Sequence, residues 1–173
     1  MIIQMTFMKQ TKIILSLLLL LLSTGCINAQ QPAKNPYYSH TDNGKLRVTD
    51  AEWKKILPSK AYYILREKGT ESPDSGPFVH NPKKGVYYCA ACGHTLFSSA
   101  AKFDSGTGWP SFYEPLNKNS VSENKDDAHG MARTEIVCAR CGGHLGHVFD
   151  DGPNPTGLRY CMNGYALSFE ANK

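Results

Sequence analysis

The chain has 173 residues and a formal net charge of +4, and 41% of its residues are hydrophobic. Neither a lysine-arginine cluster nor a basic helix face accompanies this charge, which argues against nucleic acid as a partner. The length suits one domain with a substantial core, and nothing in the composition points beyond a monomer.

The start of the chain is typical of a secretion signal. Lys9 and Lys12 precede an apolar stretch at 13–22, which is shorter than the roughly 20 apolar residues that span a bilayer. Removing residues 1–25 takes away two lysines and no acid, so the formal charge falls from +4 to +2. The sequence therefore predicts export, and the basic charge says little about partners.

Two cleavage sites are open. The segment 22–26 resembles a bacterial lipobox, in which cleavage precedes a cysteine that is then lipidated, although Ser23 stands where an aliphatic residue is usual. Ordinary cleavage after Ala29 is the alternative. We favour a signal peptide at 1–25 with lipidation of Cys26. This choice predicts a periplasmic lipoprotein anchored to a membrane of a bacterial envelope.

Residues 26–45 are polar and contain two prolines and a glycine, a composition typical of a flexible tether. A tether would give a membrane-anchored protein its reach. The folded domain is therefore expected to occupy residues 46–173.

Two helices are predicted at the start of the domain. Thr49 and Glu52 fit a capping box, and the helix that they open is short because Pro58 blocks its continuation. A second helix is predicted over residues 59–68, with Gly69 as its stop.

After the helices, short runs of aromatic and branched residues alternate with glycine, proline and asparagine. Such runs, separated by turn residues, predict an antiparallel, mainly β domain. The strands are expected at residues 85–89, 133–138, 145–149, 158–162 and 166–169.

Four of the six cysteines form two C-x-x-C-G motifs, made by Cys89 with Cys92 and by Cys138 with Cys141. Tight turns of this kind aim both sulfurs at one point, and four thiolates favour a structural Zn²⁺. Disulfides are the alternative in an exported protein, but a bond within each motif would close only a very small loop. We expect one zinc ion that clamps distant strands.

Cys161 lies outside these motifs. A lone cysteine is commonly only a small buried hydrophobe, but His144 and His147 lie upstream in the chain. Histidines next to a thiolate can supply protons for its chemistry. The glycine-rich segment 102–112 adds Trp109, which would either fill the core or line a substrate site.

Together these segments resemble the type B methionine sulfoxide reductases, which reduce the R epimer of methionine sulfoxide in proteins. The resemblance runs from about Thr49 to Phe169. It implies two antiparallel sheets in a small β-sandwich, with a zinc clip and short N-terminal helices. The segments that carry it are residues 102–112, 138–141, 144–149, 151–153 and 159–163.

The resemblance also implies roles for the site residues. Cys161 would be the nucleophile that takes the oxygen as a sulfenic acid. His147, with His144 and Asn163, would bind and protonate the sulfoxide oxygen. The remaining residues are Trp109 as the wall for the substrate methyl group, Arg159 as a support for the thiolate and Asp151 as a partner that orients a histidine. Asn163-Gly164 is also a good hairpin-turn pair, so that its presence has a structural alternative.

One position departs from the pattern of many relatives, because Thr107 stands where they carry a resolving cysteine. We therefore expect an external thiol, such as a thioredoxin-like protein, to reduce the oxidised Cys161. A zinc-clipped β domain that only binds a partner is the competing interpretation. That alternative predicts that Cys161→Ser leaves function intact.

Overall fold

The computed structural model describes residues 35–172. The expected signal peptide, Cys26 and the first part of the expected tether lie outside the described residues. Within the described part, none of the helices has the length and apolar character needed to cross a membrane.

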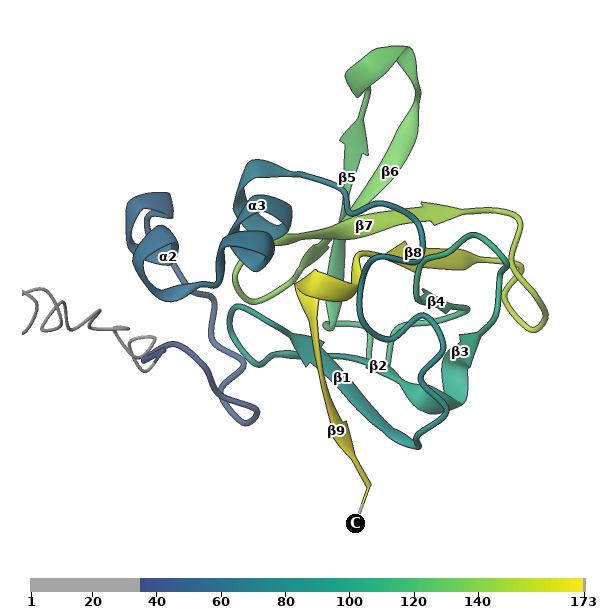
Figure 1. The fold of residues 1–173 in the computed structure, drawn as a ribbon, viewed down its shortest axis with the longest axis horizontal. Coiled ribbons are helices and arrows are strands. Elements are labelled where there is room, and N and C mark those ends of the chain that lie inside the picture. Colours follow the sequence, from purple (N-terminus) through teal and green to yellow (C-terminus); the bar gives the residue numbers. More distant parts are fainter. Residues whose placement is uncertain (1–34, 173) are drawn as a thin grey trace, which may run out of the picture. The chain divides into compact units, whose positions relative to one another are not determined.

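Within residues 35–172, nine strands form two antiparallel sheets, which confirms the mainly β fold (Figure 1). The three-stranded sheet has the order β2 (Thr95–Ser98), β1 (Gly85–Cys89) and β9 (Leu167–Ala171). The six-stranded sheet has the order β3 (Lys102–Phe103), β4 (Ser111–Phe112), β8 (Arg159–Met162), β7 (His144–Phe149), β6 (Arg133–Cys138) and β5 (Val121–Asp126). Short 3-10 helices occur at Ser99–Ala101, Ala128–Gly130 and Gly164–Ala166.

Aromatic rings join the two sheets in the core. Tyr87 and Phe97 of the three-stranded sheet and Phe112 of the six-stranded sheet are fully buried. The Phe112 ring stacks on Phe97 at a centroid distance of 4.4 Å and meets the edge of Tyr87 at 5.0 Å. Such pairs contribute about 0.5–1.5 kcal/mol each beyond their burial. These ring contacts hold β4 in place. Its other residue, Ser111, lies opposite Cys161 in the sheet.

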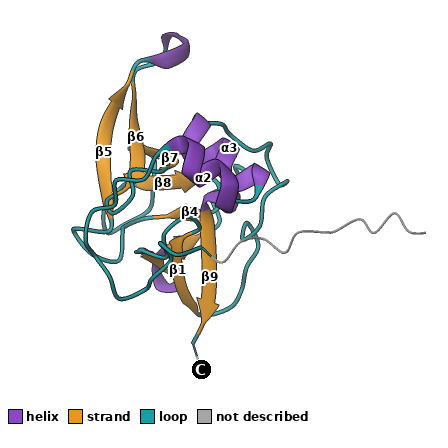
Figure 2. Ribbon diagram, turned by 90° about the vertical axis from the view of Figure 1, so that its left-hand side faces the viewer, coloured by secondary structure: helices purple, strands orange, loops and turns teal. Residues whose placement is uncertain are grey.

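In the described part of the chain the α-helices are α2 (Asp50–Ile56) and α3 (Ser59–Glu67), and α3 packs beside β7 (Figure 2). Thr49 caps α2 as expected, because its hydroxyl accepts a hydrogen bond from the Glu52 amide. The Glu52 carboxylate does not complete the capping box. It accepts a hydrogen bond from the Tyr37 hydroxyl instead.

The end of α3 differs from the expectation. The helix stops at Glu67, and Lys68 rather than Gly69 adopts the left-handed conformation, with φ 55°. The ammonium group of Lys68 forms an ion pair with Glu135, at 2.9 Å. The expected stop at Gly69 was therefore wrong by one residue.

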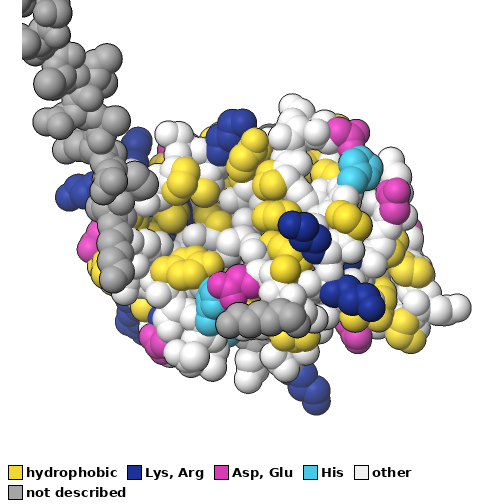
Figure 3. All heavy atoms as spheres, turned by 60° about the horizontal axis from the view of Figure 1, so that its bottom comes forward, with side chains coloured by type: hydrophobic (Ala, Val, Ile, Leu, Met, Phe, Trp, Pro, Cys, Tyr) yellow, Lys and Arg dark blue, Asp and Glu magenta, His cyan; other side chains and the backbone are white. Residues whose placement is uncertain are grey.

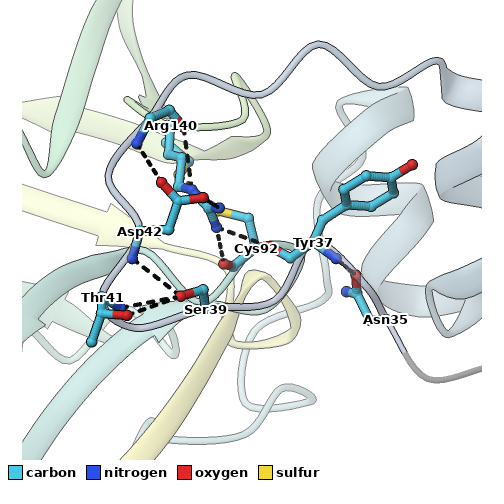
Figure 4. A network of polar contacts seen from close by, with 9 residues as sticks. Asn35, Tyr37, Ser39, Thr41, Asp42, Cys92 and Arg140 are labelled. Carbon is cyan, nitrogen blue, oxygen red and sulfur yellow. Dashed lines mark hydrogen bonds and ion pairs between the residues drawn. The ribbon is translucent and has the colours of Figure 1, made fainter.

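The N-terminal strap, residues 35–46, is fastened to the cysteine motifs (Figure 4). Arg140, which is 3% exposed, donates to the carbonyl oxygens of Cys92 at 2.6 Å and Tyr37 at 2.9 Å. Its guanidinium also pairs with Asp42 and holds the pKa of that carboxyl below its usual range, together with the Gly44 amide. Residues 35–45 are thus part of the folded body. Their polar composition indicated a tether because it did not reveal the buried guanidinium that their carbonyl groups satisfy.

On the face drawn in Figure 3, hydrophobic, basic and acidic side chains are interspersed. The C-terminal strand β9 ends on this side of the molecule. There Glu170 lies 3.5 Å from His40 of the strap.

Candidate active site

Strand register brings Cys161 and His147 together. Cys161 of β8 lies directly opposite His147 of β7 on one side and Ser111 of β4 on the other. Residues directly opposite each other in antiparallel strands point to the same face of the sheet. The thiol and the imidazole therefore share one face.

This face opens into a cavity of about 170 Å³. Its volume is smaller than the roughly 300–1,000 Å³ of pockets that hold whole small molecules, and it suits a single side chain. Among the described residues a larger cavity of 650 Å³ lies elsewhere, beside the cysteine motifs, and Cys161 does not line it. The smaller cavity is lined by Thr70, Trp109, Arg133, Gly146, His147, Phe149, Cys161, Met162 and Asn163.

A β-bulge explains how His144 and His147 come together. Residues three apart on a regular strand point to opposite faces. Here the pairing of β6 with β7 shifts register between Ile136 and Val137, which inserts one extra residue in β7. As a result the rings of His144 and His147 meet edge to face at 5.4 Å.

His144 is held behind the cavity by a buried acid. Its Nδ1 lies 2.8 Å from Glu135 Oε1, and both side chains are nearly inaccessible. Burial alone would raise the pKa of Glu135, but hydrogen bonds from Lys68, His144 and Asn124 outweigh it and lower that pKa. Burial lowers the pKa of His144 in spite of this partner. His144 therefore favours its neutral form, and its ring is placed to hold the ring of His147 in position.

His147 lines the cavity and has a different acid. Its Nε2 lies 2.7 Å from Asp126 Oδ2 at the end of β5. The same oxygen accepts a hydrogen bond from Arg133 Nη2 at 2.8 Å. The two histidines thus have separate carboxylate partners, neither of which was identified from the sequence.

The surroundings of Cys161 act on its thiol in opposite directions. Burial raises the pKa of Cys161, whereas the charge of Arg159 and the hydroxyl of Thr107 favour the thiolate. Arg159 is itself held over the ring of Phe149, with its guanidinium carbon 4.4 Å from the centroid. The arrangement shields the thiol from water and keeps one cation near it.

Asp151 does not contact a histidine. Both of its oxygens accept hydrogen bonds from Arg159, each at 2.8 Å. Asp151 follows β7 and Arg159 begins β8, so the two residues lie together where these strands are connected. The expectation that Asp151 orients a histidine is corrected: it orients Arg159, the arginine near Cys161.

Trp109 and Asn163 meet at the segment around Glu71. The Trp109 indole Nε1 donates to the Glu71 carbonyl at 3.1 Å, and the Glu71 amide donates to Asn163 Oδ1 at 3.1 Å. The buried Glu71 carboxylate accepts from the amides of Gly164 and Tyr165. Asn163-Gly164 therefore begins a 3-10 turn rather than a hairpin turn.

Three functional positions were thus missed in the sequence: Glu71, Asp126 and Glu135. The sequence did contain a signal for Glu135. It is an acid within the predicted strand 133–138, and a buried acid needs a hydrogen-bonding partner. Asp126 had none, since it ends the polar strand β5, and its partner lies on another strand. Glu71 lies in a loop whose neighbours only the tertiary fold supplies.

The four motif cysteines could hold one metal ion, because their sulfurs all lie within 4.8 Å of one another. Cys89 and Cys141 are 3.7 Å apart at sulfur, and Cys92 and Cys138 are 3.6 Å apart. A disulfide requires about 2.05 Å, so these are thiols. A tetrahedron with metal–sulfur bonds of about 2.3 Å has edges of about 3.8 Å, which the observed distances fit.

The SelR domain family matches residues 57–171. The chain is also similar to curated proteins named peptide methionine sulfoxide reductase MsrB. It is 56% identical to the one from Agrobacterium fabrum over 73% of this chain and 93% of the relative. It is 56% identical to that from Leptospira interrogans, over 74% of this chain and 98% of the relative. For the relative from Thiobacillus denitrificans the values are 60%, 70% and 92%.

Proposed function

This chain belongs to the SelR domain family and is a peptide methionine sulfoxide reductase of the B type, and from this premise we propose that Cys161 is its nucleophile. The placement of Cys161 opposite His147, at a cavity that Trp109 also lines, carries this assignment. The cavity receives one oxidised side chain, with the flat indole beside the substrate methyl group. Oxidised proteins are therefore the substrate.

Cys161 and His147 act together in the reduction of the sulfoxide. The Cys161 thiolate attacks the electrophilic sulfoxide sulfur while His147 gives a proton to the sulfoxide oxygen. The sulfur–sulfur bond made by this attack then breaks as the protonated oxygen leaves the substrate sulfur and bonds to the Cys161 sulfur, so that methionine and a Cys161 sulfenic acid form. The substrate sulfur gains two electrons and the cysteine sulfur loses them. His144 and Asn163 position His147 and the rim of the cavity.

Two external thiols complete the cycle. The first condenses with the sulfenic acid to give a mixed disulfide and water, and the second releases the Cys161 thiol as a new disulfide forms. Thr107 occupies the position where many relatives carry a resolving cysteine, and Cys89, Cys92, Cys138 and Cys141 are committed to the clip. A thioredoxin-like protein is the reductant that this arrangement requires, and the enzyme acts as a monomer.

The clip holds one structural Zn²⁺ through those four thiolates. Four thiolates at these distances match its preferred tetrahedral geometry, and zinc brings no redox chemistry. The ion ties β1 to the end of β6 and takes no part in the reaction. Arg140 extends this connection to the strap.

We also propose that residues 1–25 are a signal peptide and that Cys26 is lipidated, which makes the enzyme a periplasmic lipoprotein. The apolar stretch and the cysteine that follows it support this. Mass spectrometry of the mature N-terminus from a bacterial membrane fraction should find acylated Cys26, and Cys26→Ser should abolish acylation. A mature chain that begins at Gln30 would contradict the proposal.

The enzyme assay uses the mature protein with a peptide that contains both epimers of methionine sulfoxide, and excess dithiothreitol. We expect loss of the R epimer alone, and a rate at least ~1,000-fold lower in Cys161→Ser because the nucleophile is absent; removal of a catalytic nucleophile can cost about 10⁶ in kcat. Equal zinc content and melting temperature of the two proteins serve as the control. Undiminished activity in Cys161→Ser would exclude Cys161 as the nucleophile.

A further inference from the structure

The carboxylate of Asp126 is surrounded by donors that leave it little freedom. Its Oδ1 accepts from the Ala128 amide at 2.9 Å. Its Oδ2 accepts from Arg133 at 2.8 Å and faces His147 Nε2 at 2.7 Å. The side chain is only 18% exposed. The Ala128 amide and the His147 and Arg133 contacts hold the pKa of Asp126 far below its usual range, so it is ionised whenever the enzyme works.

An ionised carboxylate can only accept hydrogen bonds. His147 Nε2 must therefore carry a proton in this contact. In the neutral ring the second nitrogen, Nδ1, is then without one, and in the protonated ring Nδ1 carries the proton that can leave. A carboxylate at one nitrogen of a histidine also favours its charged form.

We propose that Asp126 is a positioning residue that fixes the Nε2–H tautomer of His147, so that Nδ1 is the ring atom that delivers the proton to the sulfoxide oxygen. This inference rests on the proposed function. During the reaction the proton on Nδ1 passes to the sulfoxide oxygen. The other proton stays on Nε2 of the ring, in its hydrogen bond to Asp126. Arg133 keeps the carboxylate aimed at the ring.

Other charged groups near His147 do not substitute for Asp126. Its strand neighbours that can carry charge are Asp126 from β5, Arg133 and Glu135 from β6, His144 from β7, and Cys161 and Arg159 from β8. Glu135 is bonded to His144, Lys68 and Asn124. In the part of the chain that the structure describes, Asp126 alone presents a carboxylate to a ring nitrogen of His147.

The kinetic test is the pH dependence of the first step. One equivalent of methionine released per enzyme, without any reductant, isolates the step that consumes the His147 proton. The pH profile of this rate should be recorded for the wild type, including its limb on the basic side. Asp126→Asn removes the charge, so the basic limb should move to lower pH by about one unit or more.

Asp127→Asn is the matched control. Asp127 is 60% exposed and pairs with Lys125 at the surface, so its loss should leave the pH profile unchanged. Asp126→Glu keeps the charge and should retain a basic limb closer to that of the wild type. A profile of Asp126→Asn that superimposes on that of the wild type would overturn the proposal.

The tautomer itself can be measured without turnover. Nitrogen-15 NMR of wild-type protein with labelled histidines should show, in the spectrum of the neutral ring, that the proton of His147 is on Nε2. A neutral ring with its proton on Nδ1 would refute the inference even if Asp126→Asn does not fold. Failure of the proposed function is distinct, because it would appear as wild-type protein that reduces neither epimer.

Discussion

Single side chains around Cys161 decide how the thiol reacts. Burial protects the sulfur but raises the pKa of the thiol, and Arg159 and Thr107 counter this effect. The Thr107 hydroxyl is also hydrogen-bonded to the Ser105 hydroxyl. Ser105 is hydrogen-bonded in turn to Ser111, which lies directly opposite Cys161 in the sheet. The position that many relatives use for a resolving thiol thus serves here to support the thiolate.

The position of Thr107 leads to a gain-of-function prediction. In Thr107→Cys the new sulfur should attack the Cys161 sulfenic acid, because the native hydroxyl already acts on that thiol. After one turnover without reductant, mass spectrometry of proteolytic fragments should find a disulfide between residues 107 and 161. The wild type should show no such bond. Absence of the bond in a variant that releases one equivalent of methionine would show that the two sites are too far apart.

At the scale of elements, two segments organise the site from opposite sides. The hairpin of β5 and β6 extends from the body in Figures 1 and 2 and supplies Asp126, Arg133 and Glu135. The loop after α3 supplies Glu71, whose backbone bonds to Trp109 and Asn163. The hairpin contacts the histidines of β7, the next strand in the chain. Glu71 contacts Trp109 and Asn163, which lie much further along the chain.

We expect Glu71→Ala to lower the free energy of unfolding by about 2–4 kcal/mol, because two amides of the 163–166 turn lose their acceptor. The Michaelis constant for the peptide should rise as Trp109 and Asn163 lose their alignment. Chemical denaturation and steady-state kinetics measure both. Glu67→Ala is the control, because Glu67 is exposed at the end of α3. A Glu71→Ala protein as stable as this control would contradict the assigned role.

For the whole molecule, the clip connects parts of the chain that lie far apart in sequence. Its sulfurs come from the end of β1, the end of β6 and the two turns after them, and Arg140 binds the strap to the same place. Thiolates crowded at such short distances repel one another, and a dication would hold them together. We therefore expect metal binding and folding to be coupled.

Removal of the metal should lower the melting temperature strongly, since structural zinc contributes about 10–16 kcal/mol to folding of small zinc domains. Elemental analysis should find one zinc per chain before chelation and none after it. Calorimetry should show the loss of the original transition, and Cys161→Ser should behave as the wild type does. A metal-free protein with an unchanged melting temperature would show that the clip is not structural.

Much of this protein could be predicted from sequence because its signals are local. The Cys89–Cys92 and Cys138–Cys141 motifs, the cap at Thr49 and strands β1 and β6 depend on neighbours a few residues away. Four strands were missed. The polar strand β5 and the two-residue strands β3 and β4 lack an apolar pattern and form only by pairing, and the short strand β2 was missed as well. The partners of the site residues were missed for the same reason.

The sequence by itself therefore determined the fold class, the four cysteines that could hold a metal ion and the family of the enzyme. Tertiary structure alone decided that Asp151 serves Arg159, that Asp126 and Glu135 serve the histidines, and that the strap at 35–46 is fastened by Arg140. A motif acts through residues a few positions apart, so its order along the chain reveals it. A carboxylate finds its partner through strand register, and register is set only when the sheet forms.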